Sequence, residues 1–256
     1  MLKPSTHLSF GLSILAAFGT LAIAPAASAF TFSGSSVEIS TNDVGAAFKV
    51  NFDGNVSTKN VAGLASEAIF KFLGFTTVGS KTEAAFEVTL DNTSSQGITS
   101  RTSALGFNVD QPLVGVGAAA GNGNTRSSGI FTNDRAGSFP NQFGAVNVCF
   151  TDGNTCQGGS NGGVKTPDAP GKFSPTLAFN GNVQRFTLSN FGVRYQSIDG
   201  KDFQGASGTG QGTPVKPEPP KSPTKHVPEP SSTAALVVVG VGLLYRQQKR
   251  SRLSQI

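Results

Sequence analysis

Apolar residues alternate with polar ones in several short segments of the chain. The alternation is clearest at residues 47–52, 86–91, 105–109 and 146–150, and Asp-Gly, Asn-Gly and glycine-rich turns lie between such segments. A period of two places all the apolar side chains of a strand on one face. We therefore expect half-buried antiparallel strands that are joined by turns.

Residues 61–75 are the ambiguous segment, because their apolar positions also fit one face of a helix. Phe70 and Phe72, followed by the β-branched run Thr76-Thr77-Val78, are typical of a strand. We therefore predict a strand here as well.

Near the end of the alternating region the apolar positions change parity. Phe186 and Leu188 occupy even positions, whereas Phe191 and Val193 occupy odd ones. One strand cannot bury both sets on the same face without an extra residue. We expect a β-bulge or a strand break at Ser189-Asn190.

These patterns predict an all-β fold for residues 30–204, with eight to ten strands in an antiparallel β-sandwich or jelly-roll-like single domain. The segment is long enough for one substantial core and too short for two. Its core should be rich in phenylalanine, since 18 of the chain's 20 phenylalanines lie between residues 30 and 213.

Three polar segments are expected to lie outside the strands. The glycine-rich residues 115–128 lack the Lys-Ser/Thr pair of a phosphate-binding loop, so we expect a flexible loop there, and residues 158–164 are similar. Residues 205–226 begin with Gly, Ser, Thr and Gln and continue with prolines. This composition predicts an extended Gly/Pro-rich linker after the domain.

The first 29 residues have the three parts of a secretory signal peptide. Lys3 precedes an apolar core at residues 8–23, and the small residues Ala27 and Ala29 follow it. We expect an N-terminal signal helix that is removed by cleavage after Ala29, which leaves Phe30 as the mature N-terminus. An uncleaved anchor is the alternative.

The C-terminal tail, residues 227–252, combines three features in order. Val227-Pro228-Glu229-Pro230 is followed by an apolar run at residues 234–245 and then by a basic end. As a helix, a run of that length covers about 18 Å, less than the hydrocarbon core of about 30 Å. The apolar run contains Ala234, Leu236, Val239, Leu244 and Tyr245, and the basic stop contains Arg246, Lys249 and Arg250.

This order resembles the PEP-CTERM sorting tail of bacterial envelope proteins. The resemblance implies recognition by an exosortase, a membrane protease that is thought to cut near Pro-Glu-Pro and to pass the protein to the cell surface or matrix. Tyr245 to Gln248 depart from the family pattern, in which several arginines often follow the apolar run directly. An ordinary C-terminal membrane anchor is the alternative interpretation.

The domain itself resembles the cistern family of PEP-CTERM proteins. The similarity lies in residues 86–94, 105–110 and 188–198 and in the loop between the two cysteines. That family has no established enzymatic activity, so the resemblance implies no catalytic positions.

Cys149 and Cys156 are the only cysteines, and an Asp-Gly turn lies between them. In an exported protein such a pair is expected to form a disulfide. Two thiols without a histidine would make half of a zinc site at most.

Processing removes the basic character of the chain. The net charge of the whole sequence is +5, but residues 30–230 contain equal numbers of basic and acidic side chains. The positive charge therefore belongs to the targeting segments, and a nucleic-acid partner is not expected.

The residues of the domain offer little catalytic chemistry. His7 and His226 are the only histidines and both lie outside it, which excludes catalytic triads and histidine-ligated metals. Glu83 with Glu87, and Asp199 with Asp202, remain as carboxylate pairs. Glu87 lies on the polar face of a strand, so surface solvation is a simpler interpretation than a catalytic pair. Calcium could find oxygen ligands at residues 133–134, 152–154 and 199–202, without the spacing of a calcium loop.

The sequence thus predicts an exported, non-enzymatic protein of the cell surface or extracellular matrix, without a cofactor. Its expected partners are the general secretion machinery, an exosortase and, transiently, the inner membrane. The alternative is an extracellular glycan-binding module with a polysaccharide partner. Tyr195, the only tyrosine of the domain, is expected to be a core residue with its hydroxyl at the edge rather than a sugar platform.

Overall fold

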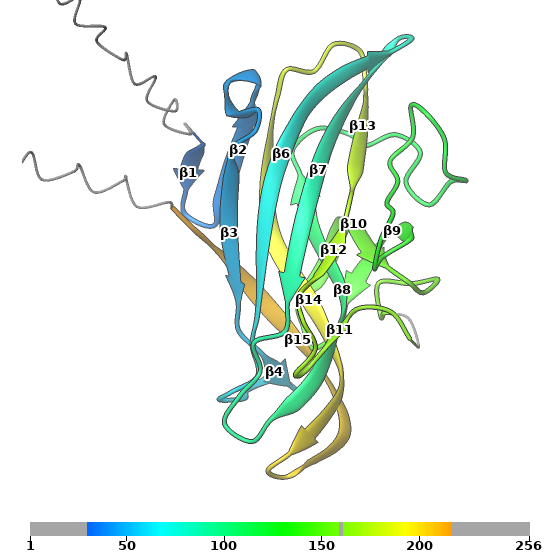
Figure 1. Ribbon diagram of the computed structural model, residues 1–256. Coiled ribbons are helices and arrows are strands. Elements are labelled where there is room, and N and C mark those ends of the chain that lie inside the picture. The colour runs from blue at the N-terminus through cyan, green and yellow to red at the C-terminus, as the bar shows by residue number, and fades with distance from the viewer. Residues whose placement is uncertain (1–29, 159–160, 217–256) are drawn as a thin grey trace, which may run out of the picture. The chain divides into compact units, whose positions relative to one another are not determined.

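The computed structural model describes residues 30–158 and 161–216, which belong to one compact unit. This part of the chain is all-β, with fifteen strands and one short 3₁₀ helix, η1 (Figure 1). The elements in chain order are β1 (Thr31–Ser33), β2 (Ser36–Ser40), η1 (Thr41–Asp43), β3 (Ala47–Phe52), β4 (Asn55–Val56), β5 (Lys59–Asn60), β6 (Ser66–Val78), β7 (Lys81–Asp91), β8 (Thr99–Val109), β9 (Asn133–Phe139), β10 (Gly144–Thr151), β11 (Val164–Lys165), β12 (Gly171–Phe173), β13 (Thr176–Asn180), β14 (Arg185–Gly200) and β15 (Phe203–Val215).

The alternating segments are strands, as predicted. They correspond to β3, the second half of β7, the second half of β8 and most of β10. The ambiguous segment also becomes a strand, since β6 covers Phe70 and Phe72. Both of these side chains are buried, which explains why their spacing of two outweighs the helical pattern.

All the named strand pairings are antiparallel and they connect the strands into one strongly curled sheet, a half-barrel. Its main path runs β12-β7-β6-β3-β15-β14-β8-β10-β9. β15 links the two halves, because Gly208 to Gln211 pair with β14 and Gly212 to Val215 pair with β3. The sheet therefore folds back on itself without a break in the main path.

Phenylalanines from both halves of the sheet meet in one core. Phe48 and Phe70 stack with their ring centroids 5.0 Å apart on β3 and β6. Phe191 of β14 lies 6.2 Å from Phe48 and 5.7 Å from Phe70, and 5.8 Å from Phe107 of β8. These edge-to-face and tilted contacts hold the two halves of the sheet together.

The parity change in the last strands is a β-bulge, as predicted. The register of β14 against β8 shifts between Ser189 and Gly192, and Asn190 adopts φ 49°. Leu188, Phe191 and Tyr195 are consequently all buried within one continuous strand. Tyr195 is fully buried, and its hydroxyl donates a hydrogen bond to the carbonyl of Asp53, so the predicted core position is confirmed.

The predicted linker boundary is wrong. Residues 205–215 belong to β15, in the middle of the sheet, so the domain continues past residue 204 to at least Val215. Gly208, Gly210 and Gly212 alternate with Thr209, Gln211 and Thr213 and are buried. An added Cβ at Gly210 would lie 2.9 Å from Tyr195 and Val193, and one at Gly212 would lie 2.6 Å from Phe191. The glycines of this strand therefore leave room for the large side chains of neighbouring strands. In this part of β15 the alternate buried positions 208, 210 and 212 are glycines, so the sequence shows no alternation of apolar and polar residues.

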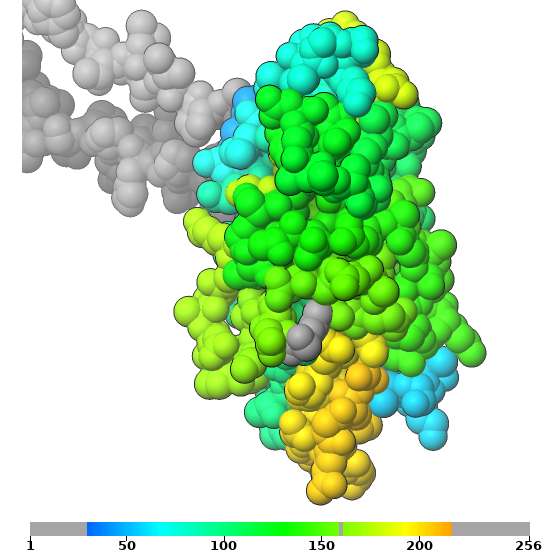
Figure 2. Space-filling model, turned by 90° about the vertical axis from the view of Figure 1, so that its right-hand side faces the viewer, coloured from blue at the N-terminus to red at the C-terminus, as the bar shows by residue number. Residues whose placement is uncertain are grey.

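Residues 110–132, the closing segment, run along β12 and β13, and in Figure 2 they belong to the green area in the middle of the face shown. Leu113, Arg126 and Gly129 form isolated bridges with Phe179, Thr176 and Phe173 of β13 and β12. The glycine-rich loop at 115–128, which was expected to be flexible, is thus hydrogen-bonded along one edge of the sheet. The loop pairs with that edge only at isolated bridges, with turns between them. Its sequence therefore shows turn residues and no alternation of apolar and polar positions.

Glu83 anchors this closing segment. Its carboxylate accepts two hydrogen bonds from the Arg126 guanidinium, at 2.7 and 2.8 Å, and one from the Gly123 amide. The bond from Arg126 lowers the pKa of Glu83 below its ordinary value of 4.5, although burial opposes the shift. Because the side chain of Glu83 is only 8% exposed, this ion pair is screened far less than a surface pair.

We predict that Glu83→Gln lowers the free energy of unfolding by roughly 2 kcal/mol at neutral pH, because Arg126 loses its partner. A carboxyl whose folded pKa is lowered stabilises the fold above its unfolded pKa. That contribution disappears as the pH falls through the lower folded pKa, so the difference between wild type and variant should shrink below about pH 4.5. Urea unfolding of both proteins at several pH values measures this difference.

Glu87→Gln is the matched control on the same strand. Glu87 faces Lys172 at 3.4 Å, and both side chains are well exposed, so its loss should cost under about 1 kcal/mol. Burial raises the pKa of Asp134, so this carboxyl makes the fold less stable as the pH rises, opposite to the effect of Glu83. The effect is the same in wild type and in both Gln variants, so it cancels from the comparison. Equal effects of the two Gln substitutions would contradict an anchoring role for Glu83.

Candidate functional site

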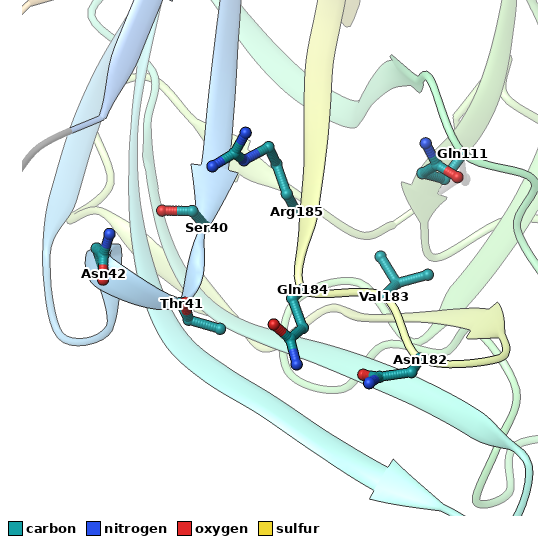
Figure 3. A pocket seen from close by; sticks show the side chains of 8 residues that line it. All are labelled: Ser40, Thr41, Asn42, Gln111, Asn182, Val183, Gln184 and Arg185. Carbon is teal, nitrogen blue, oxygen red and sulfur yellow. The ribbon is translucent and has the colours of Figure 1, made fainter.

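A polar groove lies where β2 ends and β14 begins. It has a volume of about 430 Å³, and Figure 3 shows the side chains around it. Three segments far apart in the sequence contribute to it: residues 40–42, Gln111 and residues 182–185. The complete lining is Ser40, Thr41, Asn42, Gln111, Asn182, Val183, Gln184 and Arg185.

Local hydrogen bonds fix the backbone of each wall. The backbone amide and the hydroxyl of Ser40 both donate to the carboxylate of Asp43, at 2.7 Å, and this holds the turn of η1. On the opposite wall, the Thr82 hydroxyl donates to the carbonyl of Gly181 and accepts from the amide of Val183. The pairing of β14 with β2 then places Arg185 directly opposite Ser40.

A second hollow of about 450 Å³ adjoins the groove at Gln111, which lines both. Its lining is more apolar and includes Val109, Leu113 and Val116. Asp110 fixes this junction, because it exchanges two hydrogen bonds with the backbone of Thr187. The polar groove and the more apolar hollow therefore meet at Gln111, next to the hydrogen-bonded Asp110.

The chemistry of the groove is that of neutral hydrogen bonding. Asn42, Gln111, Asn182 and Gln184 each offer an amide that both donates and accepts, as a sugar hydroxyl does. Arg185 is the one cation of the lining, and its guanidinium faces Glu38 at 3.4 Å in an exposed ion pair. Such a surface suits a hydroxyl-rich ligand better than a strongly charged one.

Cys149 and Cys156 form the predicted disulfide, with Cα atoms 5.7 Å apart. Both sulfurs are buried in a small cluster with Ala104, Phe139 and Val146. The buried guanidinium of Arg194 donates to the carbonyls of Gln157 and Gly208, so it ties the disulfide loop to the sheet. Burial lowers the pKa of Arg194.

The carboxylates considered from the sequence have separate structural partners. Glu83 pairs with Arg126 and Glu87 with Lys172. Asp199, near the end of β14, accepts a hydrogen bond at 2.8 Å from the amide of Gly205, near the start of β15. Within residues 30–158 and 161–216, no three acidic, cysteine or histidine side chains are grouped so that they could hold a metal ion.

Most of the predicted targeting residues lie outside the described residues. These are Ala27 and Ala29 of the signal peptide, the motif Val227 to Pro230, the apolar run 234–245 and the basic stop at Arg246, Lys249 and Arg250. Phe30 is the first described residue, and its buried ring lies 5.1 Å from that of Phe48. In the part of the chain that the structure describes, no helix has the length and apolarity needed to span a membrane.

Sequence reasoning did not identify the groove residues. Asn180-Gly181-Asn182 is visible as a turn signal, but nothing in the sequence indicates that this turn lies beside residues 40–42 and Gln111. The pairing of β2 with β14 brings them together across more than 140 positions of the chain. No protein-family model, curated protein sequence or solved protein structure matches the chain.

Proposed function

We propose that the chain is an exported, non-enzymatic protein of the cell surface or extracellular matrix, sorted by its PEP-CTERM tail. The Cys149–Cys156 disulfide is the observation that carries the proposal, because disulfides persist in oxidising compartments and are rare in the cytosol. The signal peptide at residues 1–29 and the tail at residues 227–252 support the same route. The exosortase and the inner membrane are then transient partners.

Counting thiols in the protein made by its own host tests the proposed compartment. The protein is denatured without reductant and treated with a maleimide, and a second sample is reduced first. We expect no label in the first sample and two labels in the second, because both cysteines are paired. Two labels without reduction would place the protein in a reducing compartment and contradict export.

A glycan-binding module is the second candidate, and the amide-rich groove of Figure 3 is the observation that favours it. The groove lacks an aromatic platform, so binding would depend on hydrogen bonds from residues such as Gln184 and Asn182. A glycan array with wild type and Gln184→Ala tests this function. Specific binding that the substitution abolishes supports it, and an array without specific binding rejects it.

We further interpret the curled sheet as a variant of the sandwich that the sequence predicts. Phe48 and Phe70 from one half pack against Phe107 and Phe191 from the other, as facing sheets do in a sandwich. A sandwich with exposed loops at its ends suits a domain displayed at a cell surface.

A further inference from the structure

A third hollow, with different chemistry, lies toward the other end of β14. It has a volume of about 260 Å³ and is lined by Thr99, Ser100, Arg101, Lys165, Thr166 and Ser197. Twelve positions of β14 separate Arg185 of the polar groove from Ser197 of this hollow. The lining holds two cations and four hydroxyls and no carboxylate.

The two cations are direct neighbours in the sheet. Lys165 of β11 is the register partner of Arg101 of β8. Like charges directly opposite each other in an antiparallel pair repel and destabilise the sheet. Within residues 30–158 and 161–216 neither side chain forms an ion pair, and Asp152 supplies the negative charge that acts on Arg101. Lys165 thus keeps its positive charge beside Arg101 without an ion-pair partner among the described residues.

Arg101 is held in a fixed orientation. The residue is only 6% exposed, and its guanidinium donates to the carbonyl of Gly162 and to the side-chain oxygen of Gln196, both at 2.9 Å. A guanidinium carries five N–H donors, so these two bonds to described residues leave donors for a ligand. A pre-oriented guanidinium is well suited to bind an oxyanion through two hydrogen bonds.

The hydroxyl side of the hollow is also preorganised. Thr166 donates to the buried amide oxygen of Asn92 at 3.0 Å, and Ser100 belongs to the same network. Ser197 lies where the register of β14 shifts, and it adopts φ 50°, an uncommon conformation for a residue with a side chain. Thr99 and Ser197 are exposed and face the same hollow. The Thr99 and Ser197 hydroxyls thus line one small volume with the two cations, while the Ser100 and Thr166 hydroxyls are engaged in the buried network.

We propose that this hollow binds an oxyanion group, and that its ligand is the carboxylate of an acidic polysaccharide. The choice of a polysaccharide rests on the proposed extracellular location, whereas the oxyanion chemistry rests on the lining alone. Residues 30–230 carry no net charge, so local contacts rather than long-range attraction provide recognition. The site lies apart from the polar groove, and its lining carries two cations where that of the groove carries one.

The test uses the full-length chain in a neutral detergent and titrates it with polygalacturonate, inorganic phosphate and neutral dextran at constant ionic strength. Lys165→Gln removes one cation from an exposed position that should not affect folding. Lys165→Arg keeps the charge. Lys71→Gln on β6 is the matched control, because it makes the same charge change on an exposed residue outside the lining.

We expect polygalacturonate to bind and dextran not to bind. Lys165→Gln should weaken polygalacturonate binding by about tenfold or more, as expected for the loss of a charge-assisted contact, while Lys165→Arg and Lys71→Gln stay close to wild type. Phosphate binding with the same dependence on Lys165, but without polygalacturonate binding, would keep the oxyanion site and reject the polysaccharide. No anion binding, or equal effects of the two lysine-to-glutamine variants, would overturn the proposal.

These outcomes are distinguishable from a failure of the proposed function. A protein with paired cysteines in its host but without Lys165-dependent binding remains an exported protein, and only the anion site is lost. Conversely, unpaired cysteines in the host with Lys165-dependent binding would keep the site and remove the reason for a polysaccharide ligand.

Discussion

Phe191→Ala is expected to lower the free energy of unfolding by about 3–5 kcal/mol, the range for a large aromatic side chain removed from a packed core. Phe191 is fully buried in β14. Its ring contacts Phe48 and Phe70 from one half of the sheet and Phe107 from the other half. The substitution therefore leaves a cavity at the point where the two halves meet, and neighbouring strands can close it only in part.

Urea or thermal unfolding of the two proteins measures this loss. Leu73→Ala is the control, because Leu73 is also a large apolar side chain but is 48% exposed, and its removal should cost less than about 1 kcal/mol. If the two substitutions had equal effects, Phe191 would not be a central contact of the core.

Removal of β15 is expected to have a still larger effect. A chain that ends after Gln204 should show no cooperative unfolding transition, whereas a chain that ends after Lys216 should keep the fold. β15 lies between β14 and β3, so its loss removes one neighbour from each of these strands and exposes the side chains of Phe191 and Tyr195 that its glycines cover. An unpaired interior edge of this kind also favours aggregation.

Circular dichroism and the dispersion of amide resonances distinguish these outcomes. Gly210→Val in the full-length chain provides a smaller perturbation of the same strand, since its Cβ would lie 2.2 Å from the carbonyl oxygen of Asp53. Gln211→Ala, at the exposed neighbouring position, is its control. A truncated chain that still unfolds cooperatively would show that residues 205–215 are the linker that the sequence suggested.

The sequence predicts the strands whose own side chains carry the apolar pattern. Phe48, Val50 and Phe52 of β3 are an example, and the bulge near Asn190 could be predicted from parity alone. β15 could not be predicted in this way, because Gly208, Gly210 and Gly212 contribute space rather than side chains to the core. The closing segment was missed for a related reason, since its residues Leu113 and Arg126 make single bridges instead of a ladder.

The same distinction applies to the candidate sites. The disulfide could be predicted because Cys149 and Cys156 are close in sequence and flank a turn. By contrast, Arg101 and Lys165 become neighbours only through the pairing of β8 with β11. The groove likewise forms only through the pairing of β2 with β14. A local apolar pattern determines which face of a strand is buried, but it does not determine which distant strand pairs with it.

Export and sorting are the central claim, and the intact mass of the protein from the envelope and from the medium of its own host tests them most directly. The account predicts a product that begins at Phe30, ends near Pro230 and is lighter by two hydrogens than the reduced chain, because the cysteines are paired. A membrane-bound product that retains Ala234 to Ile256 would contradict sorting and would make the tail a simple membrane anchor.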